Sequence, residues 1–487
     1  MDMPERKTNL LSPLSLILFS LAAMLIGSPS AAAGTGGKFT VVVVPDTQGY
    51  ADHANPPASN VNWPNRYNEH VQWIADHIKP LNIVFVSQVG DVVQNVLSKD
   101  VTEYKVAQAA WNRLHIGNDP ANPALVPYCL SIGNHDFDAK CWLMNDFKLN
   151  QNTHYGSRIW SKYFGPSRYG AQKWFGGSDA GFSHTYANTI PGAPALVRAG
   201  AGLSTYQTFQ AGGRSYLHIS LSCGAPDGEL AWADSVIAAH PGVKTIVSTH
   251  ALWDGGSFLD RARAGRYFCE VNRGLRWPNG GRYQIPGNSG KEMWDKFIGK
   301  HDQIFLVLCG HTGGQATRIE KNANGKGVIL MLFDRTHRRL STDGDGSGKY
   351  RNGAGWLRTL EFDADTGDIH CRTWSTVLKE WSDNVGGRKN GRPSLHPNAY
   401  NPDCYDGEGK LVKPGQLSDL IIRKDLTIVP SSTPATPTTA DSPAKSGGQL
   451  APTTAPTDPS GPPPPSRPRR PIPAGTLSRQ PDSKVLA

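Results

Sequence analysis

Several apolar runs of this chain end abruptly in polar side chains. A strand of aliphatic residues that stops in this way is typical of a buried strand whose last turn faces a reactive centre. The clearest case is the run 126–132, which stops at Gly133 and then presents Asn134, His135 and Asp136. Glycine allows a tight turn, asparagine offers an amide oxygen and histidine a titratable nitrogen. The residues that end five such runs are Asp46, Asp91, Asn134, His250 and His311.

The apolar runs alternate with segments of helical periodicity. Helices are predicted around 67–78 and 104–114, from Asp227, and at 293–298. Strands are predicted at 39–44, 83–86, 126–132, 216–221, 243–248 and 304–308. Because the carboxyl ends of parallel strands converge on one crevice in an open α/β sheet, the five polar residues are expected to lie together. Oxygen and imidazole donors in such a crevice suit a transition metal.

The later part of the chain changes to hairpins. Two are predicted, at 317–333 around Asn324-Gly325 and at 357–374 around Asp365-Thr366-Gly367. Strand–helix alternation followed by antiparallel strands predicts an α/β protein in which two mixed sheets pack together with helices outside.

The segment 137–182 is rich in aromatic residues, glycine and arginine but has no clear periodicity. It is expected to be a long loop over the active face that carries specificity. Tyr50 and Arg168 either line the substrate cleft and bind phosphate or are surface loop residues without a role in the site. The sequence leaves both interpretations open. His218 lies opposite the apolar face of its strand and is expected to be partly solvated.

Both ends of the chain are expected to lie outside the globular domain. Residues 1–33 have the basic start, apolar stretch and small residues of a secretory signal peptide, so export to the periplasm or the medium is predicted. Serines and a proline interrupt the stretch and disfavour an uncleaved anchor helix. Residues 431–487, rich in proline, threonine, serine and alanine, predict a disordered tail. One domain, 38–430 with its core at 38–375, remains, and none of its segments is apolar enough to span a membrane.

Charge and cysteine content exclude little. The formal net charge is +9, but the predicted domain has no basic run and thus no nucleic-acid signature. The 7 cysteines are widely spaced without a Cys-x-x-Cys pair, which disfavours a structural zinc site. Cys129 and Cys309 lie in predicted strands and are expected to be buried small hydrophobic residues.

Taken together, the motifs resemble the calcineurin-like metallophosphoesterase superfamily over about residues 38 to 375. The resemblance implies a four-layer α/β/β/α sandwich with a two-metal centre, which hydrolyses a phosphate mono- or diester by attack of metal-bound hydroxide. The matching motifs are Asp46-Thr47-Gln48, Gly90-Asp91-Val92-Val93, Gly133-Asn134-His135-Asp136, Thr249-His250 and Gly310-His311-Thr312-Gly313.

The resemblance also implies roles for these residues. Asp91 would bridge the two metals and Asp46 would hold the first. His135 would protonate the leaving-group oxygen, with Asp136 orienting it. The ligands of the second metal would be Asn134, His250 and His311.

Two departures from the family motifs concern the first metal. The first motif of the family usually has a histidine where this chain has Gln48. The last motif of the family usually ends in a second histidine, and this chain has Gly313 at that position. The first metal then keeps Asp46, shares Asp91 and has at best the amide oxygen of Gln48. We expect it to bind more weakly or to be a hard ion such as Mn²⁺, Mg²⁺ or Ca²⁺.

The sequence therefore supports two hypotheses about the function of the chain. The chain is a secreted metal-dependent phosphoesterase, or it is a binding or scaffold protein on the same fold whose depleted first site leaves it catalytically weak. Retention of His135 and Asp136 favours the enzyme. The sequence does not decide whether the divalent ions are manganese, iron, zinc, magnesium or calcium, nor which phosphoester is the substrate.

Overall fold

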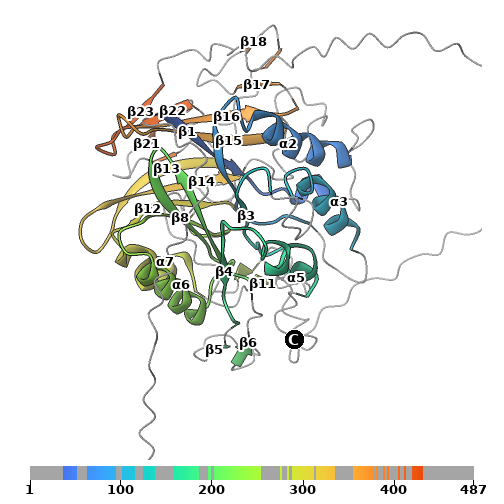
Figure 1. Ribbon diagram of the computed structural model, residues 1–487, viewed down its shortest axis with the longest axis vertical. Coiled ribbons are helices and arrows are strands. Elements are labelled where there is room, and N and C mark those ends of the chain that lie inside the picture. Colours follow the sequence, from blue (N-terminus) through green and yellow to red (C-terminus); the bar gives the residue numbers. More distant parts are fainter. Residues whose placement is uncertain are drawn as a thin grey trace, which may run out of the picture. The chain divides into compact units, whose positions relative to one another are not determined.

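Two mixed β-sheets form the centre of the computed structural model (Figure 1). The first sheet has the order β23-β22-β16-β15-β1-β2-β3, with β17 paired to β16. β1, β2 and β3 are parallel, and the other neighbours are antiparallel. The strands are β1 (Lys38–Val44), β2 (Ile83–Gln88), β3 (Tyr128–Leu130), β15 (Trp356–Asp363), β16 (Ile369–Ser375), β17 (Glu380–Trp381), β22 (Asp419–Ile422) and β23 (Ile428–Pro430).

The second sheet has the order β13-β14-β12-β9-β8-β7-β4. Its central strands β14, β12, β9 and β8 are parallel, and β13, β7 and β4 add antiparallel edges. The strands are β4 (Phe175–Ser178), β7 (Thr205–Ala211), β8 (Arg214–Ser220), β9 (Lys244–Ser248), β12 (Ile304–Cys309), β13 (Gly314–Lys321) and β14 (Gly327–Asp334).

The structure describes only part of the chain. All described residues belong to one unit, residues 1–436. The predicted signal peptide, nearly all of the predicted tail and Gly313 lie outside them. The described residues are 37–51, 63–94, 101–115, 124–137, 158–181, 183–185, 196–198, 202–253, 275–276, 282–283, 288–311, 314–334, 355–377, 379–381, 388–389, 392–393, 404–405, 411–412 and 419–431.

Helices cover the sheets and complete four layers, as predicted. Residues Val42 and Val44 of β1 pack with α2 and α3, while Val41 and Val43 face the core that the two sheets share. α6 and α7 pack against the second sheet, away from α2 and α3 (Figure 1). No described helix is long and apolar enough to cross a bilayer. The helices are α1 (Gln48–Ala51), α2 (Trp63–His77), α3 (Thr102–Trp111), α5 (Arg158–Phe164), α6 (Asp227–Ala239) and α7 (Gly290–Lys296), with short 3-10 turns η2 (Pro166–Arg168) and η4 (Ile298–Lys300).

The segment 137–182 is more ordered than the sequence suggested. Its described part contains α5 and η2, and β4 extends the second sheet by pairing with β7. Its aromatic residues supply the reason, because Trp160, Phe164 and Tyr169 are buried in the core beside α3. Short two-stranded ribbons complete the described structure: β5 (Ser183–Thr185) with β6 (Leu196–Arg198), β10 (Leu275–Arg276) with β11 (Arg282–Tyr283), β18 (Arg388–Lys389) with β19 (Arg392–Pro393), and β20 (Cys404–Tyr405) with β21 (Leu411–Val412).

Three polar residues prove to be structural. Arg168 donates from Nε to the Tyr128 hydroxyl at 2.9 Å and is buried, so it is neither surface decoration nor a cleft residue. Tyr50 is buried against the edge of the Tyr67 ring. His218 was expected to be partly solvated, but it is fully buried between the sheets.

The cysteines agree with the prediction where they are described. Cys129 and Cys309 are buried in β3 and β12, and burial raises the pKa of their thiols to about 11 and about 12. Cys223 and Cys371 are also buried and form no disulfide.

Candidate metal centre

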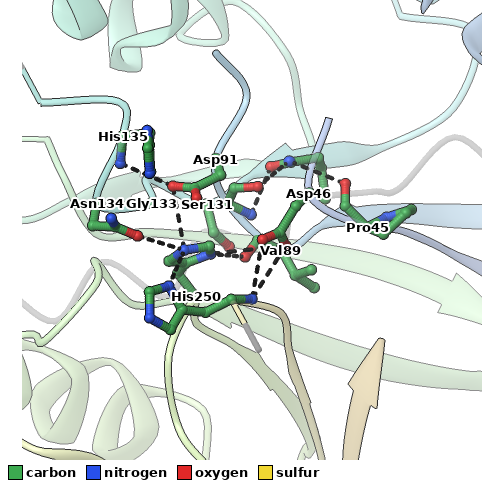
Figure 2. A network of polar contacts seen from close by, with 12 residues as sticks. Pro45, Asp46, Val89, Asp91, Ser131, Gly133, Asn134, His135 and His250 are labelled. Carbon is green, nitrogen blue, oxygen red and sulfur yellow. Dashed lines mark hydrogen bonds and ion pairs between the residues drawn. The ribbon is translucent and has the colours of Figure 1, made fainter. Parts of the chain in front are cut away.

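The five predicted strand-end residues come together at one edge of the two sheets. The first sheet contributes three of them, which follow the parallel strands β1, β2 and β3, and the second contributes two, which follow β9 and β12. Figure 2 shows His250 between the side chains of Asp46, Asp91 and Asn134. The site is therefore built from both sheets and exists only when they are packed together.

Four ligand atoms converge at His250. Its Nε2 lies 2.9 Å from Asn134 Oδ1, 3.2 Å from Asp91 Oδ1 and 3.0 Å from His311 Nδ1. One ring nitrogen makes one hydrogen bond, so hydrogen bonding does not account for all three contacts. Ligands about 2.1 Å from a shared ion lie about 3 Å apart in octahedral geometry. This donor set fits a bound metal ion.

The other nitrogen of His250 sets the tautomer of the ring. Nδ1 lies 2.9 Å from the Val89 carbonyl oxygen. A carbonyl oxygen only accepts, so Nδ1 donates to it and Nε2 presents its lone pair to the group of donors. Burial works against a charged His250, but the neighbouring Asp91 carboxylate raises the pKa of the imidazole above its ordinary value. A metal ion would take over this attraction to Asp91.

Asp91 occupies the middle of the site. It is 2% exposed and has a φ of 53°, which is uncommon outside glycine. Its Oδ1 accepts from the backbone N–H of His135 at 2.9 Å. Burial alone would raise the pKa of Asp91, but the His250 and His135 imidazoles hold it well below the ordinary value. Asp91 is thus an ionised carboxylate placed between both groups of candidate ligands.

The segment that contains Asp46 and Gln48 lies against Asp91, because the backbone N–H of Thr47 donates to the Asp91 carbonyl oxygen at 3.0 Å. The Asp46 carboxylate is buried, accepts from the backbone N–H of His311 at 3.1 Å and lies 4.0 Å from His250 Nδ1. The Gln48 side-chain oxygen is buried and has no hydrogen-bond partner in the described structure. Leaving a buried amide oxygen without a donor is costly, and a cation would satisfy it. These residues fit an ion that prefers oxygen ligands.

Two glycines leave room for the candidate ligands His250 and Asp91 to pack against the backbone. Gly90 has a φ of 103°, and a Cβ there would lie 2.5 Å from Nδ1 of His250. A Cβ at Gly133 would lie 2.2 Å from the Asp91 carboxylate. The Gly-Asp and Gly-Asn motifs therefore contain glycine because another ligand packs directly against its backbone.

His135 is oriented by a backbone group. Its Nδ1 lies 2.8 Å from the carbonyl oxygen of Gln94, so Nδ1 donates and Nε2 is the nitrogen that can exchange a proton. Asp136, the predicted orienting residue, accepts from the backbone N–H groups of Val93 at 3.0 Å and Gly133 at 2.8 Å. Burial and then the Asp91 charge raise the pKa of Asp136 to about 8. In the described contacts the Asp136 carboxylate stabilises the turn at residues 133–136, while the Gln94 carbonyl oxygen orients the His135 ring.

Two adjacent residues of α3 fix these backbone segments. Glu103, 1% exposed, accepts from the backbone N–H of Gln94 at 2.7 Å. Tyr104 donates from its hydroxyl to the carbonyl oxygen of Asp136. The first turn of α3 therefore secures both the group that contacts His135 and the turn that contains it. Sequence reasoning missed Gln94, Glu103 and Tyr104 because backbone hydrogen bonds leave no motif.

The chain belongs to the calcineurin-like phosphoesterase family, whose model matches residues 39–315. A curated relative, the uncharacterized protein YvnB of Bacillus subtilis (strain 168), is 24% identical over 346 residues, which are 70% of this chain and 20% of that protein. The chain thus spans about a fifth of the length of this relative.

Solved structures of similar proteins include two phosphatases. A dimetal phosphatase from Danio rerio is 10% identical with a TM-score of 0.34, covering 70% of this chain and 96% of that one. The purple acid phosphatase PPD1 from yellow lupin seeds is 11% identical with a TM-score of 0.35, covering 71% and 52%. These TM-scores are too low to bear on function, so the family assignment rests on the family model.

Proposed function

We propose that the chain is a metal-dependent phosphoesterase that hydrolyses a phosphate mono- or diester. The observation that carries this proposal is the convergence of Asp91, Asn134, His250 and His311 at separations of 2.9 to 3.2 Å between neighbouring donor atoms. A chain that had lost its metals would have no reason to keep lone pairs facing one another in a buried site. Membership of the phosphoesterase family supports the reaction class.

The protein's own residues would divide the work between holding metals and moving a proton. Asn134, His250 and His311 would hold one ion, Asp46 and Gln48 the other, and Asp91 would bridge them. When bound, the ions would supply a nucleophile at neutral pH and neutralise charge on the phosphoryl oxygens.

His135 would act as the general acid of the reaction. It follows Asn134 directly, and the Gln94 carbonyl holds its Nδ1. A proton on Nε2 can then pass to the departing oxygen of the ester. Asp136 supports this step through the backbone of the turn rather than through the ring.

Metal content and turnover, measured on one preparation, test the proposal. Two ions per chain by elemental analysis, with hydrolysis of an aryl phosphate monoester or diester, are expected. One ion or none, with no turnover after Mn²⁺ is added, would instead support the catalytically weak binding protein. Comparing monoester with diester rates also decides the substrate class.

The proposal includes export. The basic, apolar and small-residue order of residues 1–33 supports a cleaved signal peptide. Expression in a bacterial host should place the mature chain outside the cytoplasm, and mass spectrometry should find its N-terminus close to residue 34. An intact N-terminus in the cytoplasmic fraction would refute export.

A further inference from the structure

β14 brings one more carboxylate to the edge where β12 delivers His311. The two strands are parallel neighbours, and Leu332 of β14 is paired with Cys309 of β12. Asp334 therefore follows its paired residue by two positions, as His311 follows Cys309. The carboxyl ends of neighbouring parallel strands lie at the same edge of a sheet, so Asp334 and His311 are expected to lie next to each other at the ends of β14 and β12. There the His311 backbone N–H donates to Asp46 at 3.1 Å.

Asp334, like Asp46, is a buried carboxylate. The Asp334 side chain is 0% exposed. On the other side of β14, Asp334 is paired with Gly314 of β13, the residue that follows Gly313 in the last motif. Such buried carboxylates coexist only when protons or cations neutralise them.

The first metal position is short of ligands without Asp334. Its motifs supply only Asp46, the Gln48 amide and the shared Asp91, because Gln48 and Gly313 replace the histidines of the family motifs. Hard divalent ions take about six or more oxygen ligands, some of them water. One further buried carboxylate at this edge would make up for the missing side chains.

We propose that Asp334 is a ligand of the first metal, together with Asp46, Gln48 and Asp91. The inference rests on the metal centre of the proposed function. The protein's donors at this position are then all oxygen, which favours Mn²⁺, Mg²⁺ or Ca²⁺ over Zn²⁺. The second position contains two imidazoles, so the two ions differ in chemistry.

Titration of the full chain with Mn²⁺ by calorimetry, with elemental analysis, tests the assignment. The original chain is expected to bind two ions. Asp334→Asn keeps the shape but removes the charge, and it should bind one ion normally and the other at least tenfold more weakly. Asp419→Asn is the matched control: Asp419 is 6% exposed, contacts His370 at 2.6 Å and lies on β22, three strands from β1. It should bind two ions with the original affinities, whereas two such ions in Asp334→Asn would overturn the proposal.

A second variant keeps the proposal testable if Asp334→Asn does not fold. Asp334→His retains a donor but replaces oxygen by nitrogen, so the preference of the first site should shift tenfold or more from Mn²⁺ toward Zn²⁺. An unchanged preference would also overturn the assignment. Both experiments measure metal binding and not hydrolysis. A chain that binds two ions but hydrolyses no ester would therefore refute the proposed function and leave the role of Asp334 intact.

Discussion

His135 is the residue whose replacement separates chemistry from metal binding. Its ring contacts the Gln94 carbonyl, and its backbone N–H, which any residue provides, contacts Asp91. His135→Ala should lower turnover of esters with poor leaving groups by about 10²- to 10⁴-fold while the metal content stays unchanged. Esters with good leaving groups need less protonation and should lose less.

The control for this prediction is a histidine outside the site. His301 contacts Asp234 at 2.6 Å and is partly exposed, so His301→Ala should leave turnover and metal content as they were. Steady-state rates on esters of graded leaving-group pKa measure the effect. Equal losses for good and poor leaving groups would contradict the role of His135 as general acid.

Gly90 is required for a steric as well as a conformational reason. Gly90→Ala places a methyl group against His250 and adds the cost of a positive φ, about 1–3 kcal/mol. Gly213 is a matched control, with a φ of 71° and nothing within 4 Å of an added Cβ. Both variants should lose stability in urea unfolding, but only Gly90→Ala should also lose metal affinity. Equal metal affinity in the two variants would count against the contact with His250.

The contrast between Asp46 and Glu103 shows what the sequence can reveal at the residue scale. Asp46 ends a β-branched strand, so its position was predictable from the pattern, as was that of the four other strand-end residues. Glu103 acts through the backbone N–H of Gln94, nine residues earlier in the chain. Neither residue type nor spacing marks such a contact. The same holds for Asp334, whose importance depends on the register of β14 against β12.

At the scale of elements, α3 positions the candidate general acid without contributing a candidate metal ligand. Glu103 holds the backbone of Gln94, whose carbonyl oxygen contacts the His135 ring, and Tyr104 holds the backbone of Asp136, which follows His135. Glu103→Gln weakens the acceptor for the Gln94 N–H and should lower turnover of poor leaving groups about tenfold, with metal content unchanged. Glu69→Gln, an exposed position on α2, should have no effect. Loss of metal in Glu103→Gln would show a purely structural role.

Elements with clean periodicity were predictable and the others were not. The helix of Tyr67, Val71 and Ile74 formed as α2 because its apolar face packs on β1. The segment 158–181 gave no period because its aromatic residues pack in several directions around Tyr128. Its helix and edge strand therefore depend on tertiary contacts that sequence patterns do not encode.

At the scale of the whole molecule, we expect metal binding and folding to be linked. The candidate ligands come from both sheets, so bound ions would stabilise the packed state and not the unfolded chain. At a metal concentration about 100 times the dissociation constant, one site adds about 2.7 kcal/mol. Chelation should therefore lower the melting temperature, and Mn²⁺ should restore it in the original chain more than in His250→Ala. An unchanged melting temperature after complete chelation would contradict this linkage.

The two sheets are also joined by a buried histidine that makes stability depend on pH. His218 of β8 contacts Gln207 at 2.8 Å and, across the sheets, Ser87 of β2 at 3.3 Å. Burial lowers the pKa of His218 to about 3. The unfolded chain, with a histidine pKa of about 6.5, takes up a proton below that pH that the folded chain does not. The contribution of His218 is thus complete above pH 6.5 and falls by about 1.4 kcal/mol per unit as the pH drops toward 3.

Urea unfolding of the original chain and of His218→Gln measures this contribution. Glutamine preserves hydrogen bonding but does not titrate, and His70, whose pKa burial also lowers to about 3, is present in both chains and cancels from the comparison. Between pH 7.5 and pH 5 the original chain should lose about 2 kcal/mol more stability than His218→Gln. Equal losses would mean that His218 is protonated in the folded chain. Water or a counter-charge would then have to reach the space between the sheets, and the shared core would be less tightly closed than its buried side chains indicate.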